Sequence, residues 1–442
     1  MKRFWKTEKN DSPQNGDKEK PDTRILLKHR KQDRGLTIEE YKRDGGYSSL
    51  EDTLKNLKPK DVIQKLDEAG IRERGGEGFS LGTRWRSVTD DAPFPRYFVV
   101  ICDEMEPGTF KDRVLLHTSP HNLIEAMIIA GYAISAQKGF IFVSPSYETL
   151  AVILEREILI ARENGYLGED ILGSGFNYEI VVHRSGGRYI CGEATALLSA
   201  IEGKRPNPRQ LPPYPATRGM WGKPTVENNA ETVAWVPHVL RLGAAWYKNL
   251  AVTDNGGGTK LYCVSGKVNK PGCYELPMGT RLSEIIDIHA GGMQEGSRFK
   301  ACLPGGASTR FMTREFYDID MDFDTLKKAG HCLGTGGMIV FDHKTCLVDA
   351  TLNLMNFFAR QSCGWCTPCR EGIPYIYDLL GRIENGDGKP EFVSMLKDMS
   401  RYLRYSYCGL APGAASPLES LIACFEDEIF EHIRLKKCPF RD

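Results

Sequence analysis

Residues 96–101 read RYFVVI, a short apolar run rich in β-branched and aromatic side chains. Two further runs of this kind, GFIFV (139–143) and YEIVVHR (178–184), follow it along the chain. Such continuous runs are typical of strands that are buried on both faces of a parallel sheet. Between them lie helical patterns at residues 120–135 and 147–165. The alternation of strands and helices predicts an α/β layered domain with a mostly parallel sheet.

The chain changes character after DNGGG (254–258), which we interpret as a linker. The runs TKLYCVSGKV and GCYELP, separated by NKP, predict a hairpin. A helical segment at 280–292, with Thr280 as its N-cap, comes next. This order, followed by more short strands, predicts a small β-grasp-like module that ends at about residue 325. The final part of the chain is helical, and its apolar stripe predicts a bundle face formed by Leu418, Leu421, Ile422, Phe425, Ile429, Phe430 and Ile433.

The composition argues against several classes of protein. The 442 residues are 41% hydrophobic and 26% charged, as in ordinary globular chains, and suffice for roughly two to four domains. Equal totals of 58 basic and 58 acidic residues give no net charge, which argues against a nucleic-acid binder or a basic membrane-surface protein. No apolar run reaches the roughly 18 residues of a membrane helix. Residues 1–45 are polar and lysine-rich, and we expect a flexible extension there that is not a secretory signal.

The strongest chemical signal is SCGWCTPCREG (362–372). Cys363, Cys366 and Cys369 are three residues apart, and Cys408 follows in YSYCGLAPG. A C-x-x-C-x-x-C run suits three corners of an iron–sulfur cubane, with the fourth thiolate supplied from elsewhere in the chain.

Alternatives to this interpretation remain open. A structural zinc site would more often use two C-x-x-C pairs. The competitors for the fourth ligand are Cys332, Cys346 and Cys424. For most of the thirteen cysteines the simplest role is that of a small buried apolar residue. Thr367, as an N-cap before Pro368, predicts a helix whose positive end faces the thiolates.

Four further segments are suited to a nucleotide. The glycines of RERGGEGFSLGTRW (72–85) allow close approach of a backbone to a phosphate or ring, although a plain loop is equally compatible. CDEMEPGTFKDR (102–113) places three acids at the carboxyl end of a strand, where open α/β sheets bind ligands; a solvated turn is the alternative. Residues 184–209 repeat a strand, glycines and a helix, and residues 222–237 offer two asparagine amides for a heterocycle edge.

In this order, these segments resemble the F subunits of NADH–quinone oxidoreductases, the respiratory complex I family, in their bacterial form. The resemblance spans about residues 40–435 and includes KACLPGGAST and LGTGGMIVFD. It implies a Rossmann-like FMN- and NADH-binding domain, a β-grasp domain, and a C-terminal helical bundle that carries one [4Fe-4S] cluster. The implied boundaries are 1–45 for the extension, 46–253, 259–325 and 335–442.

The resemblance also implies site residues. Those on the NADH side are Arg74, Gly75, Gly76, Gly78, Phe79, Gly82, Arg84, Glu104, Glu106 and Tyr214. Those around FMN are Asp103, Tyr189, Gly192, Glu193, Asn228 and Asn229. The cluster ligands are Cys363, Cys366, Cys369 and Cys408. No side-chain nucleophile or base is implied, because the cofactors supply the reactivity.

The chain departs from the family at four positions of the nucleotide pocket. Ile101, Glu77, Arg84 and Ala194 stand where the family has Asn, Ala, Lys and Glu. Because these positions surround the flavin and the nicotinamide, the departures bear on the affinities for FMN and NADH. None of them touches the four cysteines.

The implied function is that of an NADH dehydrogenase subunit, with hydride transfer from NADH to FMN and single-electron transfer to the cluster. The implied partners are the other subunits of complex I, above all the thioredoxin-like [2Fe-2S] subunit and the large iron–sulfur subunit. Membrane association would be indirect, on the cytoplasmic face of a bacterial inner membrane. The alternatives are a diaphorase subunit of a soluble NAD-linked hydrogenase or formate dehydrogenase, and a cluster-bearing scaffold with a decayed nucleotide pocket.

Overall fold

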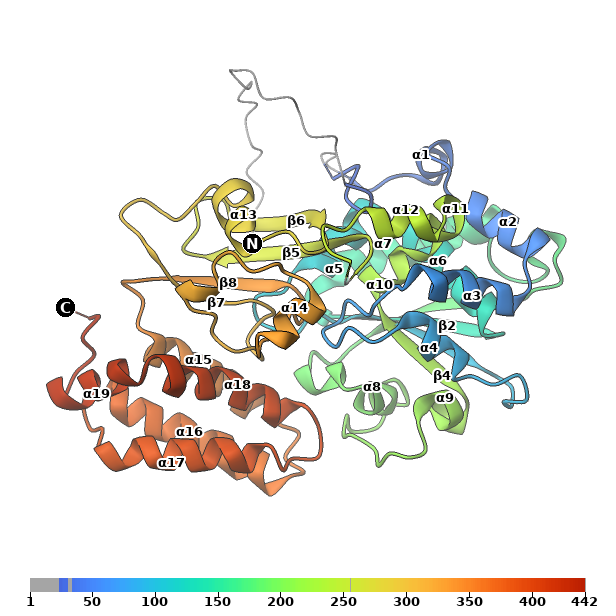
Figure 1. The fold of residues 1–442 in the computed structure, drawn as a ribbon. Helices are drawn as coiled ribbons and strands as arrows, with labels where there is room; N and C mark the ends of the chain where they lie inside the picture. The colour runs from blue at the N-terminus through green and yellow to red at the C-terminus, as the bar shows by residue number, and fades with distance from the viewer. Residues whose placement is uncertain (1–23, 31–33, 255, 442) are drawn as a thin grey trace, which may run out of the picture.

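The structure is a computed structural model that describes residues 24–30, 34–254 and 256–441. Figure 1 shows a parallel sheet surrounded by helices, a second sheet beside it, and the C-terminal helices packed below the second sheet. None of the described helices is long and apolar enough to cross a membrane.

The first sheet has four parallel strands in the order β3-β2-β1-β4. They are β1 (Tyr97–Cys102), β2 (Lys138–Val143), β3 (Glu179–Arg184) and β4 (Thr225–Asn229). The first three confirm the strands predicted from the apolar runs, and the mixed α/β class is confirmed. β4 was not predicted, because its sequence TVENN is polar at most positions although all of its residues are buried. Its polar side chains find hydrogen-bond partners inside the protein.

The two helices predicted between the strands are present as α6 (Pro120–Ala133) and α7 (Glu148–Glu163). Nearly every residue of α6 is buried, because α2, α7, α10 and α11 surround it. The other helices of this part are α1 (Ile38–Arg43), α2 (Ser48–Asn56), α3 (Pro59–Ala69), α4 (Leu81–Arg86), α5 (Lys111–Thr118), α8 (Ala194–Ile201), α9 (Pro215–Arg218), α10 (Ala230–Ala234), α11 (Val236–Leu242) and α12 (Ala244–Asn249).

The described part of the expected N-terminal extension is packed against the protein. Leu26 and Leu27 are buried, and the backbone amides of Ile25, Leu26 and Leu27 donate to the carboxylate of Glu275 at 2.7–3.0 Å. The expectation of a flexible tail is therefore wrong for the described residues, since the apolar run ILL supplies core contacts. Residues 1–23 and 31–33 of that extension lie outside the described residues.

The second sheet has the order β6-β5-β8-β7. Its strands are β5 (Thr259–Gly266), β6 (Gly272–Pro277), β7 (Phe299–Leu303) and β8 (Gly337–Asp342). β5 and β6 form the predicted antiparallel hairpin, β5 and β8 are parallel, and β7 and β8 are antiparallel. Because β8 is an inner strand, the second sheet extends beyond the expected boundary at residue 325, and the expected helical domain cannot begin at 335.

The helix expected after the hairpin is shorter than predicted. α13 (Leu282–Glu284) continues as a π-helical turn, Ile285–His289. Its N-cap is Arg281, because the hydroxyl of Thr280 donates to the carbonyl of Pro277 instead of capping the helix. A further helix, α14 (Phe323–Lys328), precedes β8.

The C-terminal part is helical, as the sequence indicates. Its helices are α15 (Leu347–Gln361), α16 (Thr367–Glu384), α17 (Pro390–Leu403), α18 (Leu410–Cys424) and α19 (Glu426–Leu435). The predicted stripe is divided at Phe425, where α18 ends and α19 begins in a new direction. Leu418, Leu421 and Ile429 of the stripe are buried, whereas Phe430 is 41% exposed because the turn moves it off the common face.

Candidate functional site

The carboxyl ends of the parallel strands meet at one edge of the first sheet, the position at which such sheets bind ligands. Asp103 follows β1, Ser144 follows β2 and Ser185 follows β3. Both carboxylate oxygens of Asp103 are buried and make no hydrogen bond with the described residues. Burial raises the pKa of Asp103 to about 6, and the nearby hydroxyls of Ser185 and Ser144 partly oppose this. A buried carboxylate with free acceptor capacity at this edge suits the hydroxyls of a polar ligand.

The glycine loop, residues 75–79, lies beside this edge. It is closed by the amide of Glu73, which donates to the carbonyl of Phe79 at 2.7 Å. Gly76 and Gly78 have φ angles of +138° and +67°, which favour glycine. No atom lies within 4 Å of the point where a Cβ of Gly76 would be, and Phe79 is 57% exposed. The loop therefore presents open backbone and one aromatic ring.

Glu73 holds the glycine loop on the sheet. One carboxylate oxygen accepts from the amides of Gly75 and Asn229 at 3.2 and 3.0 Å and from the hydroxyl of Thr232 at 2.7 Å. The other accepts from the side-chain amide of Asn228. This buried anchor was not predicted from the sequence, and the only signal was an acid just before the glycines.

The loop carries charges that face the start of α8. Desolvation raises the pKa of Glu77, Arg84 lowers it, and Glu73 and Glu193 raise it further. Arg84 donates to the carbonyl of Glu227 at 2.9 Å, and the two side chains pair at 3.1 Å. Burial raises the pKa of Glu227 to about 7 although Arg84 lowers it. Glu77 and Glu193 thus lie within electrostatic reach of each other across the pocket.

The two glutamates of the acidic loop have protein partners. Glu104 accepts from the amides of Asp112 and Arg113 at 2.8 and 3.1 Å, at the start of α5. Glu106 accepts from the Tyr189 hydroxyl at 2.6 Å and from the amide and hydroxyl of Ser308, both at 2.8 Å. Their carboxylates therefore fix the loop, and their place on the NADH side stays a prediction.

Several other predicted residues also point into the protein. The guanidinium of Arg74 donates to the Tyr247 hydroxyl and the Gly257 carbonyl, both at 2.8 Å. Asn228 accepts from the Trp85 indole at 2.8 Å, and a Cβ at Gly82 would lie 2.5 Å from Asp67. Through these internal contacts, Arg74, Asn228 and Gly82 support the segments that form the site. Tyr214 is 61% exposed and directly precedes α9.

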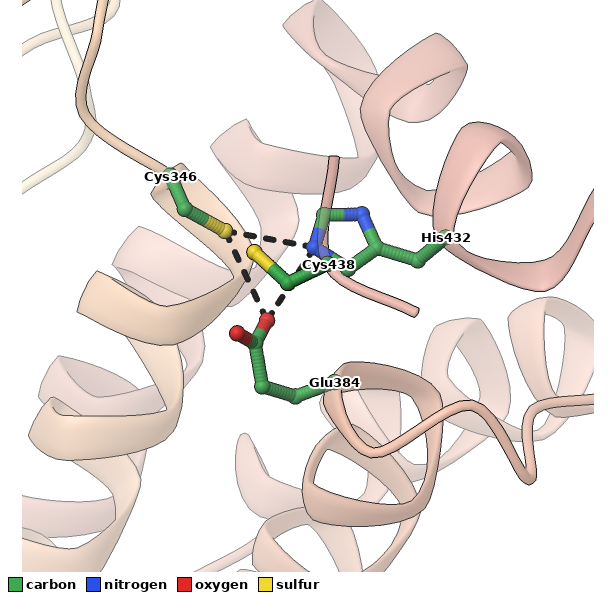
Figure 2. A group of neighbouring side chains, drawn as sticks. All are labelled: Cys346, Glu384, His432 and Cys438. Atoms are coloured by element: carbon green, nitrogen blue, oxygen red, sulfur yellow. Dashed lines mark hydrogen bonds and ion pairs between the residues drawn. The ribbon is translucent and has the colours of Figure 1, made fainter. Parts of the chain in front are cut away.

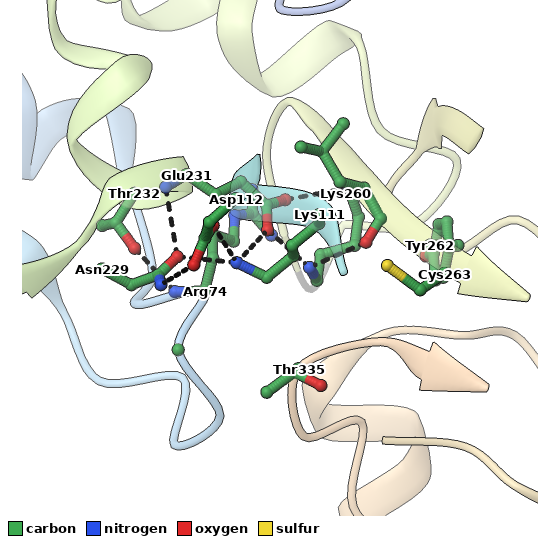
Figure 3. Close-up of polar contacts among 12 residues, drawn as sticks. Arg74, Lys111, Asp112, Asn229, Glu231, Thr232, Lys260, Tyr262, Cys263 and Thr335 are labelled. Carbon is green, nitrogen blue, oxygen red and sulfur yellow. Dashed lines mark hydrogen bonds and ion pairs between the residues drawn. The ribbon is translucent and has the colours of Figure 1, made fainter. Parts of the chain in front are cut away.

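Asn229 belongs to a buried ionic network that the sequence did not reveal (Figure 3). Lys111 donates to Asp112 and to Asn229, both at 2.7 Å. Lys260 of β5 donates to Glu231 of α10 at 2.7 Å, and the Lys111 ammonium lies 3.1 Å from the same carboxylate. Burial lowers the pKa of Lys260 to about 8, although Glu231 raises it. The network fastens the second sheet to the edge of the first.

Tyr189 joins the strand edge to the C-terminal helices. Besides donating to Glu106, it packs its ring edge-on against Phe357 and Phe358 of α15, with centroids 5.2 and 5.8 Å away. The Cys408 thiol is near enough to contribute to the raised pKa of Tyr189, after burial and Glu106. Gly192 and Glu193 come three and four residues after Tyr189, and Glu193 caps α8 by accepting from the Ala196 amide at 2.7 Å.

The four predicted cysteines form one group. The amide of Tyr407 donates to the Cys366 sulfur at 3.3 Å, which brings the segment of Cys408 against the triplet. Burial raises the pKa of Cys408 to about 11, and Cys363 and Cys369 contribute. α16 begins beside them, with Cys366 as its N-cap rather than the predicted Thr367. The positive helix end therefore faces the sulfurs, as expected.

The three competing cysteines lie elsewhere. Cys332 is near Gly76, Cys424 is exposed at the end of α18, and Cys346 is buried at the start of α15. The sulfurs of the four predicted cysteines, all among the described residues, do not come within 4.8 Å of one another as a group. A single zinc ion needs its sulfurs about 3.8 Å apart, so the wider spacing of these four sulfurs fits a multi-iron cluster better.

Comparisons with known proteins agree with this geometry. Residues 66–238 match the family described as Nuo51 FMN-binding domain, and residues 349–432 match the NADH-ubiquinone oxidoreductase-F iron-sulfur binding region. Residues 261–311 match the SLBB domain.

Curated proteins that are named as NADH-quinone oxidoreductase F subunits are similar to this chain. The one from Escherichia coli is 45% identical over 394 residues, 88% of each chain. Another, from Rhizobium meliloti, is 42% identical over 94% of this chain and 99% of its own. Among solved structures, a chain of an NAD+-reducing [NiFe]-hydrogenase in the H2-reduced state has a TM-score of 0.78 and 34% identity. That alignment covers 89% of this chain, which spans only 65% of the hydrogenase chain.

Proposed function

Because the chain belongs to the family of NADH-quinone oxidoreductase F subunits, we propose that it oxidises NADH on bound FMN and delivers single electrons to one [4Fe-4S] cluster. The observation that carries the proposal is the position of Tyr189. It is hydrogen-bonded to Glu106 at the strand edge and lies against α15, beside Cys408. The nucleotide edge and the cysteine group are thus neighbours, as an electron path between them requires. FMN supplies hydride acceptance and one-electron release when it is bound.

Asp103 is the residue that fits the flavin best. Its two unsatisfied oxygens lie among the ends of β1, β2 and β3 and would accept from ligand hydroxyls. The segment between β3 and α8 completes the proposed FMN site with Tyr189, Gly192 and Glu193. Asn228 and Asn229 act indirectly, since their amides hold the glycine loop and the buried network.

The open face of the glycine loop is the proposed NADH surface. Gly75, Gly76, Gly78 and Phe79 offer backbone and a ring for stacking, and Arg84 stands beside them. Residues Arg74, Gly82, Glu104 and Glu106 support this surface through internal contacts, and Tyr214 would reach it only from an exposed position.

The four cysteines are the proposed cluster ligands. Cys363, Cys366 and Cys369 come from one turn before and within α16, and Cys408 from the loop before α18. The α16 dipole stabilises the negative charge of a thiolate-bound cluster.

The chain acts as one subunit of a larger complex, as its family membership shows. We propose the thioredoxin-like [2Fe-2S] subunit and the large iron–sulfur subunit as its immediate partners, on the cytoplasmic face of a bacterial inner membrane. We also propose three domains: the flavin domain, a β-grasp domain built on the second sheet, whose inner parallel pair β5 and β8 fits that fold, and the helical cluster domain.

The test is metal, flavin and activity analysis of anaerobically purified protein. We expect about four irons and one FMN per chain, with NADH-dependent ferricyanide reduction. Cys408→Ser should lose or alter the reduced-state EPR signal and keep FMN, whereas the matched variant Cys424→Ser should change neither. An unaltered signal in Cys408→Ser would show that the fourth ligand is misassigned. Absence of both FMN binding and NADH oxidation would refute the function and favour a scaffold.

A second candidate is the diaphorase subunit of a soluble NAD-linked hydrogenase. The structural similarity to the [NiFe]-hydrogenase chain favours it. The lower sequence identity, 34% against 45%, and the unmatched third of that chain favour the first proposal. Identification of the proteins that co-purify from the native host distinguishes the two.

A further inference from the structure

A second group of potential metal ligands lies in the C-terminal helices, separate from the four cysteines (Figure 2). It consists of Cys346 before α15, Glu384 at the end of α16, His432 in α19 and Cys438 beyond α19. All four side chains are buried, and one ligand atom from each lies within 4.8 Å of the others. Three separate parts of the sequence, at residue 346, at residue 384 and at residues 432–438, thus present two sulfurs, one imidazole and one carboxylate to a common point.

The separations are those of a single coordination sphere. The Cys346 sulfur is 3.3 Å from Nε2 of His432 and 3.5 Å from Oε2 of Glu384, and these last two atoms are 3.1 Å apart. A tetrahedral ion with bonds of about 2.0–2.3 Å needs ligand atoms about 3.3–3.8 Å apart. Small shifts of these side chains would therefore allow the four ligand atoms to coordinate one ion.

The surroundings orient the ligands as they do in protein metal sites. Nδ1 of His432 lies 2.6 Å from the carbonyl of Glu428, so that it donates there and leaves Nε2 with a lone pair toward the group. The amide of Asp349 donates to the Cys346 sulfur at 3.3 Å. Arg441 lies 3.4 Å from the outer oxygen of Glu384, an oxygen that makes no hydrogen bond among the described residues.

We propose that Cys346, Glu384, His432 and Cys438 bind one structural zinc ion. The mixture of sulfur, nitrogen and oxygen donors suits zinc, and four buried protein ligands leave no open position for catalysis. Binding would release the two thiol protons to solvent, and the net charge of the dithiolate–carboxylate site would be balanced in part by Arg441.

The position of α16 indicates that the proposed zinc ion stabilises the packing of the C-terminal helices. This helix has 18 residues, begins at the four-cysteine group and ends with Glu384. Its length is about 27 Å, so the zinc ion would lie at the far end from the redox cluster. It would tie the start of α15, the end of α16, α19 and the segment after α19 together. Loss of the ion should destabilise the packing of these four segments without changing the redox cluster.

The experiment is elemental analysis of the full-length, cluster-containing protein, purified anaerobically without a histidine tag. We expect about one zinc beside about four irons per chain. Cys438→Ser and His432→Gln should each lower the zinc content about fivefold or more and leave the iron and the EPR signal unchanged. The control is Cys424→Ser, an exposed cysteine of α18, which should keep its zinc.

Three results would overturn the proposal. They are wild-type protein with no zinc above that of the buffer, zinc that persists undiminished in Cys438→Ser, and a Cys346–Cys438 disulfide in the native protein. If the variants do not fold, zinc-edge X-ray absorption of the wild-type protein decides the matter. Two sulfur and two nitrogen or oxygen neighbours support the site, and any other set refutes it. These readouts do not depend on NADH oxidation, so the proposal and the proposed function can fail separately.

Discussion

Glu73→Gln tests whether one buried carboxylate positions the glycine loop. Glu73 accepts from Gly75, Asn228, Asn229 and Thr232. A glutamine offers one acceptor oxygen, so its amino group must face a donor. If that donor is Asn228, rotation of the Asn228 amide cannot help, because its oxygen already accepts from Trp85.

The magnitude follows from these contacts. One donor left facing another costs about 1–3 kcal/mol, and bonds to a charged acceptor are stronger than neutral ones by about 1 kcal/mol each. The lower desolvation cost of a neutral side chain offsets part of this loss. We expect a net destabilisation of about 3 kcal/mol, or roughly 6–12 °C in Tm for a unit of this size. If only about 1.4 kcal/mol of this loss weakens the binding conformation of the loop, the KM for NADH should rise about tenfold.

The assay is thermal unfolding together with NADH–ferricyanide kinetics. The matched control for the Tm, and not for the KM, is Glu77→Gln, the same change at an exposed position of the same loop, which should alter stability by less than about 0.5 kcal/mol. A Glu73→Gln protein with wild-type Tm and wild-type KM for NADH would refute this account of the loop.

Two further predictions concern the pocket. Since burial raises the pKa of Asp103 to about 6 and the ionised carboxylate accepts a hydrogen bond more strongly than the protonated group, FMN affinity should level off above about pH 7 and fall as the pH drops through 6. Fluorescence titrations of FMN at several pH values should show this dependence of affinity on pH in the wild-type protein and not in Asp103→Asn. The same dependence in both proteins would contradict the role of Asp103. Because Glu77 reaches Glu193 electrostatically, we expect it to replace the carboxylate missing at Ala194. Ala194→Glu should then leave the KM for NADH unimproved alone but lower it about 2- to 13-fold in the Glu77→Ala background. Additive effects in this double-mutant cycle would show that the two positions are independent.

The sequence predicted the parts of the fold that repeat a simple pattern. β1, β2 and β3 are apolar runs, whereas β4 was missed because Glu227, Asn228 and Asn229 are buried through internal partners that no local pattern reveals. The same limit applies to the site. The four-cysteine group was predictable because three ligands are adjacent in sequence.

The sequence could not give the contacts of side chains whose partners are distant along the chain. Glu106 was expected on the NADH side, and its protein partners, Tyr189 and Ser308, come from other parts of the chain. Cys346 was considered only as a competitor for the fourth cluster ligand or as a small apolar residue, because Glu384, His432 and Cys438 are distant from it in the sequence. His432 lies six residues before Cys438, but one such pair does not by itself indicate a metal site.

The contacts between the two sheets limit how this chain can be recombined with its relatives. Lys260 with Glu231 and Glu106 with Ser308 cross from one sheet region to the other. A chimera joined at the glycines before β5 would take the two members of each pair from different parents. Where the parents differ at one of these positions, a buried charge would lose its partner, so exchanges that keep both pairs from one parent should fold more often than exchanges that follow the boundary in the sequence.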